Sequence, residues 1–215
     1  MQVSRIRALR GPNLWSRHTA IEAIVSCTPQ ESGLSAQHPV EQQLRRIFPE
    51  VGPFDGQRPG EPVTLAHALE KVTLGLQAHA GCPVSFSRTT PTEEPGVFQV
   101  VIQYTEEAVG RLALELAEQL CQAAIQGAGF DLEGTIAQLH ELDEDVRLGP
   151  STGAIVDAAV VRGIPIRRLT DGSLVQFGWG AQQRRIQAAE TDTTSAIAES
   201  IAQDKDLTKT LLHAA

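Results

Sequence analysis

The stretch H-A-L-E-K at residues 67–71 carries the side chains of this chain that are best suited to metal chemistry. In the pattern H-x-x-E-H, two imidazoles one helical turn apart hold Zn²⁺, and the carboxylate beside them activates the zinc-bound water for hydrolysis. His67 and Glu70 fill two of the three positions, but Lys71 stands where the second histidine belongs. Because an ammonium group offers no lone pair and repels the ion, the sequence predicts no metal site here.

A helix that begins at Thr64 is expected to position this motif. Its apolar residues recur at helical spacing and form one stripe, made of Leu65, Leu69, Val72 and Leu76. His67, Glu70 and Lys71 would then lie on the opposite side of the helix. The simplest interpretation of the motif is a polar helix face with a surface pair between Glu70 and Lys71.

The remaining patterns of residues 1–147 predict a small α+β domain that ends near Arg147. We expect strands at residues 3–9, 84–87 and 97–104, and helices at residues 19–25, 40–48, 106–124 and 131–142. Residues 49–62 contain four prolines and three glycines, which predicts an exposed connector.

Residues 148–215 alternate between helical and β-type patterns. We expect a helix capped by Ser151 or Thr152, short strands at residues 164–169, 173–177 and 184–186, and a last helix that begins near Asp192. Gly178–Gln183 has too few glycines for a dinucleotide loop and is interpreted as a turn. These elements are too few to cover both faces of a sheet, so we expect residues 148–215 to be an incomplete α/β region. We therefore expect this chain to be the front part of a longer protein.

The longest specific motifs lie near the two ends of the chain. The run RGIPIRRLTDGSLVQFGWGAQQRRI and the later run TSAIAESIAQDKDLTKTLL resemble the entry into the ATP-grasp domain of cyanophycin synthetases. The opening RALRGPNLWSRHTAIEAIV is similar to the start of the same enzymes. The resemblance covers essentially all 215 residues, and it implies an N-terminal domain at 1–147 followed by the beginning of an ATP-grasp region at 148–215.

The resemblance implies an activity for the longer enzyme. Cyanophycin synthetases use ATP to join aspartate and arginine into a polymer with an aspartate backbone and arginine side chains. Their ATP- and Mg²⁺-binding groups lie downstream of the segment that resembles this chain, and no Walker A pattern occurs here. We therefore expect no cofactor in this chain, and ATP with Mg²⁺ in the full-length family enzyme.

The resemblance also bears on candidate site residues. Some family members have a metallopeptidase-like N-terminal domain of the inverted zincin type, with a further acidic ligand from a later helix. Glu106 or Glu107 stands at the start of the predicted helix 106–124 and could match that ligand, but two ligands rarely hold a zinc, so the motif is interpreted as vestigial. For contacts with the polymer's guanidinium groups, the acidic candidates are Glu106, Glu107, Glu141, Asp143, Glu144 and Asp145.

Three hypotheses follow for the function. In the first, this is the N-terminal part of a cyanophycin synthetase-like ligase, and it binds the polymer without catalysing on its own. In the second, a metallopeptidase-like domain trims the polymer, with Lys71 as the main obstacle. In the third, the chain is a non-catalytic remnant or a partner of a separate ligase subunit. Homo-oligomerisation stays open in all three.

Composition narrows the class of protein. The net charge of −8 and an aromatic fraction of 4% argue against nucleic acid as a partner. Cys27, Cys82 and Cys121 are widely spaced, which favours reduced thiols. The N-terminal residues lack the apolar region of a signal peptide, and no run is long enough for a membrane span. We therefore expect a cytoplasmic protein with no membrane partner.

Overall fold

The computed structural model describes residues 1–35, 37–51, 54, 63–188 and 190–214. By its internal contacts the chain divides into two compact units, Met1–Arg147 and Leu148–Ala215. Helices occur beside an antiparallel sheet in each unit, so the predicted α+β class is confirmed.

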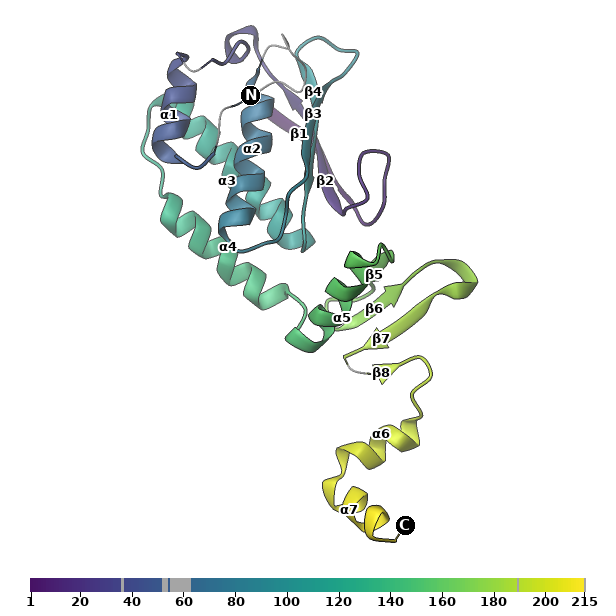
Figure 1. Ribbon diagram of the computed structural model, residues 1–215. Helices are drawn as coiled ribbons and strands as arrows, with labels where there is room; N and C mark the ends of the chain where they lie inside the picture. The colour runs from purple at the N-terminus through teal and green to yellow at the C-terminus, as the bar shows by residue number, and fades with distance from the viewer. Residues whose placement is uncertain (36, 52–53, 55–62, 189, 215) are drawn as a thin grey trace. The chain divides into compact units, whose positions relative to one another are not determined.

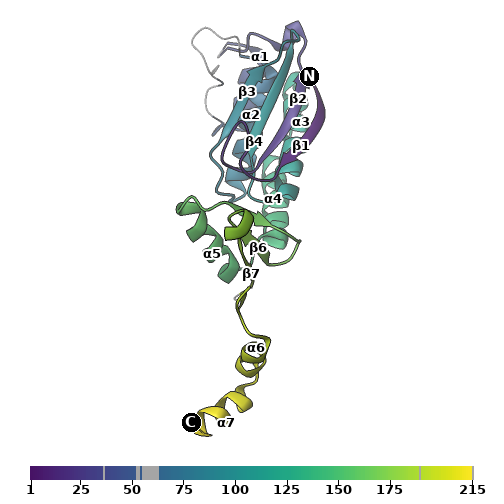
Figure 2. The same cartoon turned by 90° about the vertical axis from the view of Figure 1, so that its right-hand side faces the viewer.

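A four-stranded antiparallel sheet of order β1-β2-β4-β3 forms one layer of the first unit. Its strands are β1 (Gln2–Leu9), β2 (Ala20–Ser26), β3 (Ser87–Pro91) and β4 (Val97–Gln103). Figure 1 shows the helices of this unit on one side of the sheet, and Figure 2 looks onto the opposite face. The opposite face is called the outer face below.

The predicted helix at residues 19–25 is wrong, because this segment is the central strand β2. It pairs with β1 on one side and with β4 on the other. Ile21, Ala23 and Val25 belong to the hydrophobic core, which gives the two-residue period of a strand. The β-branched Ile21, Ile24 and Val25 also fit a pleated surface better than a helix.

Four helices of the described residues lie on the inner side of the sheet, two of them in contact with its strands and two packed on those helices. They are α1 (Pro39–Ile47), α2 (Leu65–His79), α3 (Glu107–Gln126) and α4 (Leu132–Val146), and a short 3₁₀ turn, Pro29–Glu31, precedes them. Two caps set their limits, since the Asp131 carboxylate accepts from Gly134 N at 2.9 Å and Gly127 ends α3 with φ of 65°. The predicted helices at these four places are confirmed to within a few residues.

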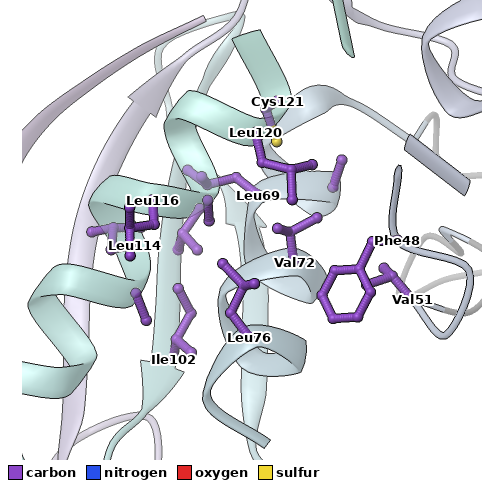
Figure 3. Packing of buried hydrophobic residues seen from close by; sticks show 14 of the residues in the cluster. Phe48, Val51, Leu69, Val72, Leu76, Ile102, Leu114, Leu116, Leu120 and Cys121 are labelled. Carbon is purple, nitrogen blue, oxygen red and sulfur yellow. The ribbon is translucent and has the colours of Figure 1, made fainter. Parts of the chain in front are cut away.

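The core of the first unit lies between α2, α3 and the sheet. Figure 3 shows Leu69, Val72 and Leu76 of α2 near Leu120 of α3 and near the ring of Phe48. All four α2 residues of the predicted apolar stripe are at most 1% exposed. The aliphatic stripes of two long helices thus supply most of the buried surface that stabilises this unit.

Two segments of the first unit differ from the prediction. The strand expected at 84–87 begins only at Ser87, because the side-chain carbonyl of Gln103 accepts the amides of Ser85 and Phe86, each at 3.0 Å. The connector 49–62 was expected to be exposed, yet Val51 and Phe54 are buried. Residues 52–53 and 55–62 of that connector lie outside the described residues.

The second unit packs one helix on a small antiparallel sheet. Helix α5 (Pro150–Val161) contacts strands of order β5-β6-β7-β8, namely β5 (Ile166–Arg168), β6 (Leu174–Phe177), β7 (Arg184–Gln187) and β8 (Glu190–Thr191). Among the described residues its hydrophobic core is a small cluster of buried side chains, Val156, Val175 and Ile186. The N-cap of α5 is Gly149, so the predicted cap at Ser151 or Thr152 is wrong. Proline at the first helical position fixes the start one turn earlier.

The C-terminal segment forms two short helices in place of the single predicted one. Ser195 caps α6 (Ala196–Gln203), and Asp204 caps α7 (Lys205–Ala214) by accepting from Asp206 N and Leu207 N at 3.0 and 2.9 Å. A residue that accepts both amides starts a new helix rather than continuing the old one. Within the described ranges, no helix has the length and apolar character needed to cross a membrane.

Candidate functional site

The motif of residues 67–71 lies in the first two turns of α2. Thr64 caps this helix, and its backbone N–H donates to Nδ1 of His67 at 3.2 Å, with the Thr64 hydroxyl 3.1 Å from the same nitrogen. The ring of His67 also packs edge-on against Phe98 of β4, with centroids 5.9 Å apart. Because Nδ1 accepts the cap hydrogen bond, a neutral His67 carries its proton on Nε2. The imidazole therefore has a structural role at the helix start.

Glu70 is buried against the sheet rather than exposed on a polar helix face. The Ser87 hydroxyl donates to Glu70 Oε1 at 2.6 Å, and Lys71 Nζ lies 3.4 Å from the same oxygen. The side chain of Glu70 is 2% exposed, whereas that of Lys71 is 43% exposed. The interpretation of His67 and Glu70 as an exposed polar face is thus wrong, since α2 is covered on both of these sides. Lys71 reaches in from the rim and neutralises the buried carboxylate.

A metal centre is not assembled around this motif. Among the described residues, the structure brings together no group of three or more His, Cys, Asp or Glu side chains that could hold an ion. Glu106 is the N-cap of α3, and Glu107 begins the same helix. Neither glutamate forms a three-ligand group with His67 and Glu70.

Glu107 instead joins two arginines at the start of α3. Arg10 Nε donates to Glu107 Oε2 at 2.7 Å, and Arg111 Nε donates to Oε1 at 3.0 Å. The hydrogen bond from Arg10 is the main reason that the pKa of Glu107 lies below its usual value. Burial, with the Glu107 charge nearby, raises the pKa of Tyr104 to about 12. Glu107 is therefore engaged by the chain's own cations.

The acidic candidates on α4 fall into two groups. Glu141 and Asp145 are exposed and have no ion-pair partner among the described residues. Glu144 is exposed too, but Arg147 Nη2 lies 3.3 Å from its Oε1 and His140 Nε2 lies 3.7 Å from it. Of the α4 acids, Glu141 and Asp145 are thus the most available to an external cation.

Asp143 belongs to the joint between α4 and the end of α2. It is buried, with Cys82 Sγ 3.6 Å from Oδ1 and Arg147 Nη1 3.9 Å from Oδ2. Next to it, His140 Nδ1 lies 2.9 Å from the Ala80 carbonyl oxygen. Burial raises the pKa of the Cys82 thiol to about 11, which keeps it protonated as a donor. Asp143 holds the two helices together.

The outer face of the sheet carries charged residues that sequence reasoning missed. Arg7 Nε donates to Glu22 Oε2 at 2.9 Å, and Gln99 Nε2 donates to Glu22 Oε1 at 2.6 Å. Arg88 lies on the same face, since its neighbours Ser87 and Thr89 point toward α2. Reading residues 19–25 as a helix conceals this set, because only strand alternation places Glu22 beside Arg7.

Comparison with known proteins agrees with the resemblance seen in the end motifs. Residues 50–126 match the family described as "Cyanophycin synthase-like N-terminal domain". Over its whole length the chain is 38% identical to the cyanophycin synthetases of Trichormus variabilis and of a Nostoc species. It is 34% identical to that of Geminocystis herdmanii, over 99% of this chain. The chain spans about a quarter of the length of these curated relatives, 25% or 26%. The whole chain is thus similar to cyanophycin synthetases, and its residues 50–126 resemble a cyanophycin synthase-like N-terminal domain.

Proposed function

We propose that this chain acts as the N-terminal part of a cyanophycin synthetase-like, ATP-dependent ligase that joins aspartate and arginine. In this proposal residues 1–147 hold the growing Asp/Arg polymer and do not catalyse. Residues 148–215 form the beginning of the ATP-grasp region, and ATP and Mg²⁺ bind elsewhere in such a ligase. The similarity to cyanophycin synthetases along the whole chain supports the first part of this proposal.

The observation that carries the binding role is the pair of open carboxylates on α4. Glu141 and Asp145 are four residues apart, so they lie on one face of the helix, and both are exposed. A polymer with regularly spaced guanidinium groups can engage both carboxylates at once. Each exposed contact contributes on the order of 1 kcal/mol or less, but repeated contacts along one polymer add up to measurable avidity.

The structure favours this binding role over a peptidase. A zinc hydrolase needs three ligands and an open coordination position, and Lys71 Nζ lies 3.4 Å from the carboxylate that would serve as the general base. Glu70 is also held by Ser87, which leaves it in a structural network. No observation in the described residues favours the trimming hypothesis over binding.

The test is a titration of purified Asp/Arg polymer into the protein by isothermal calorimetry, at low and at high salt and with and without Mg-ATP. The double variant Glu141→Gln/Asp145→Asn should weaken binding several-fold at low salt. The matched control is Glu50→Gln/Glu93→Gln, which removes the same charge from two exposed acids outside α4. Because the attraction joins exposed charges, binding of the wild-type protein should weaken as salt rises.

Three outcomes would contradict the proposal. Absence of binding at low salt would favour the inert remnant. Equal losses in the α4 variant and in its control would show that general charge, not α4, draws the polymer. Tighter binding with Mg-ATP present would place a nucleotide site in these residues.

A further inference from the structure

Four residues stand in one register row across the outer face of the first sheet. Arg7 of β1 is opposite Glu22 of β2, Glu22 is opposite Val101 of β4, and Val101 is opposite Arg88 of β3. The row therefore reads Arg7, Glu22, Val101, Arg88 across the strands. With strands about 4.8 Å apart, the two arginines start from backbones roughly 14 Å apart. No helix among the described residues of Met1–Arg147 covers this face in the view of Figure 2.

The acidic residue in this row, Glu22, already has hydrogen-bond donors within the protein. Glu22 is 3% exposed, and it accepts both Arg7 and Gln99. Val101 is 1% exposed although it lies on the outer face. Flanking side chains must therefore lie over the middle of the row, and Glu22 with Arg7 forms a neutral pair there. Little net charge remains at the β1–β2 end of the row.

Arg88, at the other end of the row, has no such partner in the part of the chain that the structure describes. Its Nε is buried and has no hydrogen-bond acceptor, and no carboxylate among the described residues pairs with its guanidinium. The residue as a whole is partly exposed. A partly buried guanidinium without a carboxylate partner destabilises the free protein, so it suggests a ligand that supplies a carboxylate.

We propose that Arg88 is the centre of a carboxylate-binding site on the outer face of this sheet. The occupant we infer is a carboxylate-bearing extended polymer, and its identification with the Asp/Arg polymer rests on the proposed function. A carboxylate matches the planar guanidinium fork in two parallel hydrogen bonds. The chain's own net charge of −8 would otherwise repel a carboxylate polymer, so binding requires a local cation of this kind.

The site complements the α4 acids. A zwitterionic polymer presents a cation and an anion in each repeat, so full recognition needs groups of both signs on the protein. Glu141 and Asp145 supply the negative groups, and Arg88 supplies an uncompensated positive one. The two sites are separable by experiment because polyaspartate offers carboxylates and no guanidinium.

The experiment titrates polyaspartate, and separately the Asp/Arg polymer, into wild type, Arg88→Ala, Arg88→Lys and Arg46→Ala at low salt. Arg46 is the matched control, an exposed arginine on α1 that has no ion-pair partner among the described residues. Arg88→Ala should weaken polyaspartate binding about tenfold, as expected for loss of one charge-assisted contact. Arg88→Lys should fall between wild type and Arg88→Ala, because it keeps the charge but loses the fork. Arg46→Ala should leave the affinity nearly unchanged.

A second readout does not depend on affinity. In a ¹H–¹⁵N spectrum tuned to arginine Nε–H groups, the Arg88 signal is assigned by its loss in Arg88→Lys. Polyaspartate should shift this signal more than any other arginine signal, because a carboxylate bound to the Arg88 guanidinium changes the electronic environment of its Nε–H. Circular dichroism of each variant checks that the fold is retained.

The outcomes separate this inference from the proposed function. If polyaspartate does not bind at low salt, or if Arg88→Ala and Arg46→Ala behave alike, the Arg88 site is wrong. If the Asp/Arg polymer binds through the α4 acids without any Arg88 effect, the proposed function stands and this inference fails. If polyaspartate depends on Arg88 while the Asp/Arg polymer does not bind, the carboxylate site is supported and the proposed function is contradicted.

Discussion

At the scale of single residues, Lys71 converts a zinc-peptidase pattern into a structural network. His67 caps α2 through Nδ1, and Glu70 is held by Ser87 and Lys71. An ammonium in this place offsets the cost of burying the carboxylate. The same three side chains thus stabilise the junction of α2 with the sheet.

The wild-type protein should therefore hold no stoichiometric zinc. Lys71→His removes the repulsive ammonium and adds an imidazole, so its zinc affinity should rise above that of wild type. It should still fall far short of one zinc per chain, because the described residues offer no third ligand beside His67. Inductively coupled plasma mass spectrometry after dialysis against micromolar zinc measures this.

Lys71→Met is the control for that experiment, since it removes the charge without adding a ligand. One zinc per chain in the wild-type protein would show that the motif is a working site. Equal zinc contents in the histidine and methionine variants would show that position 71 does not face His67.

At the scale of elements, the close approach of α3 to the sheet depends on a glycine. A Cβ at position 110 would lie 2.7 Å from Tyr104 Cβ and 3.2 Å from Ile21 Cγ1. Glycine has no Cβ, so Gly110 avoids this clash. Neither neighbour can give way easily, because Ile21 and Tyr104 are both core residues. Any side chain at this position would push the helix away from β2.

Gly110→Ala should accordingly destabilise the protein by about 1–3 kcal/mol, the usual cost of overpacking a core. Gly129→Ala is the matched control, since nothing lies within 4 Å of the place that its Cβ would take and its backbone is not left-handed. Urea unfolding followed by circular dichroism gives both values. Gly110→Ala as stable as Gly129→Ala would mean that α3 sits farther from the sheet.

The elements that sequence can predict are those with local signals. Helices α2 and α3 have long apolar stripes and clear ends, so their predicted bounds agree with the structure to within a few residues. The prediction fails at strand β2 because Ile21, Ile24 and Val25 have a helical spacing, whereas the strand places Ile21, Ala23 and Val25 in the core. Residues 84–86 form no strand because the side chain of Gln103 takes the amides of two of them, a contact between segments far apart in sequence.

In the candidate site, too, some residues can be identified from local sequence signals, and others depend on contacts between segments far apart in sequence. The identity and spacing of Glu141 and Asp145 are visible in the sequence, and their exposure follows from the helical period. The burial of Asp143 depends on Cys82, which is 61 residues away, and nothing local indicates it. Arg88 cannot be found from the sequence at all, because its place in the row depends on three strand pairings.

At the scale of the whole molecule, the two units differ in how much they bury. The first has a continuous core of many aliphatic residues between helices and sheet. Among its described residues the second has four buried hydrophobic residues, Val156, Ala159, Val175 and Ile186, and its helices α6 and α7 have none. Ile197 and Leu212 of these helices are 74% and 73% exposed. Since buried apolar area supplies most of the stabilisation, the two units should differ in stability.

Amide hydrogen exchange should resolve this difference. The amides of residues 148–215 should exchange faster than those of the strands and of α2 and α3 in residues 1–147, and α6 and α7 should be the least protected, because few packed side chains oppose their local opening. Exchange measured by mass spectrometry at two protein concentrations tests whether self-association adds protection. Protection that rises with concentration would mean that a second copy covers the exposed residues of α6 and α7. Strong protection of residues 148–215 in a monomer, equal to that of β2 and β4, would contradict the expected order, because so small a core cannot hold that unit closed as firmly as the larger core holds the first.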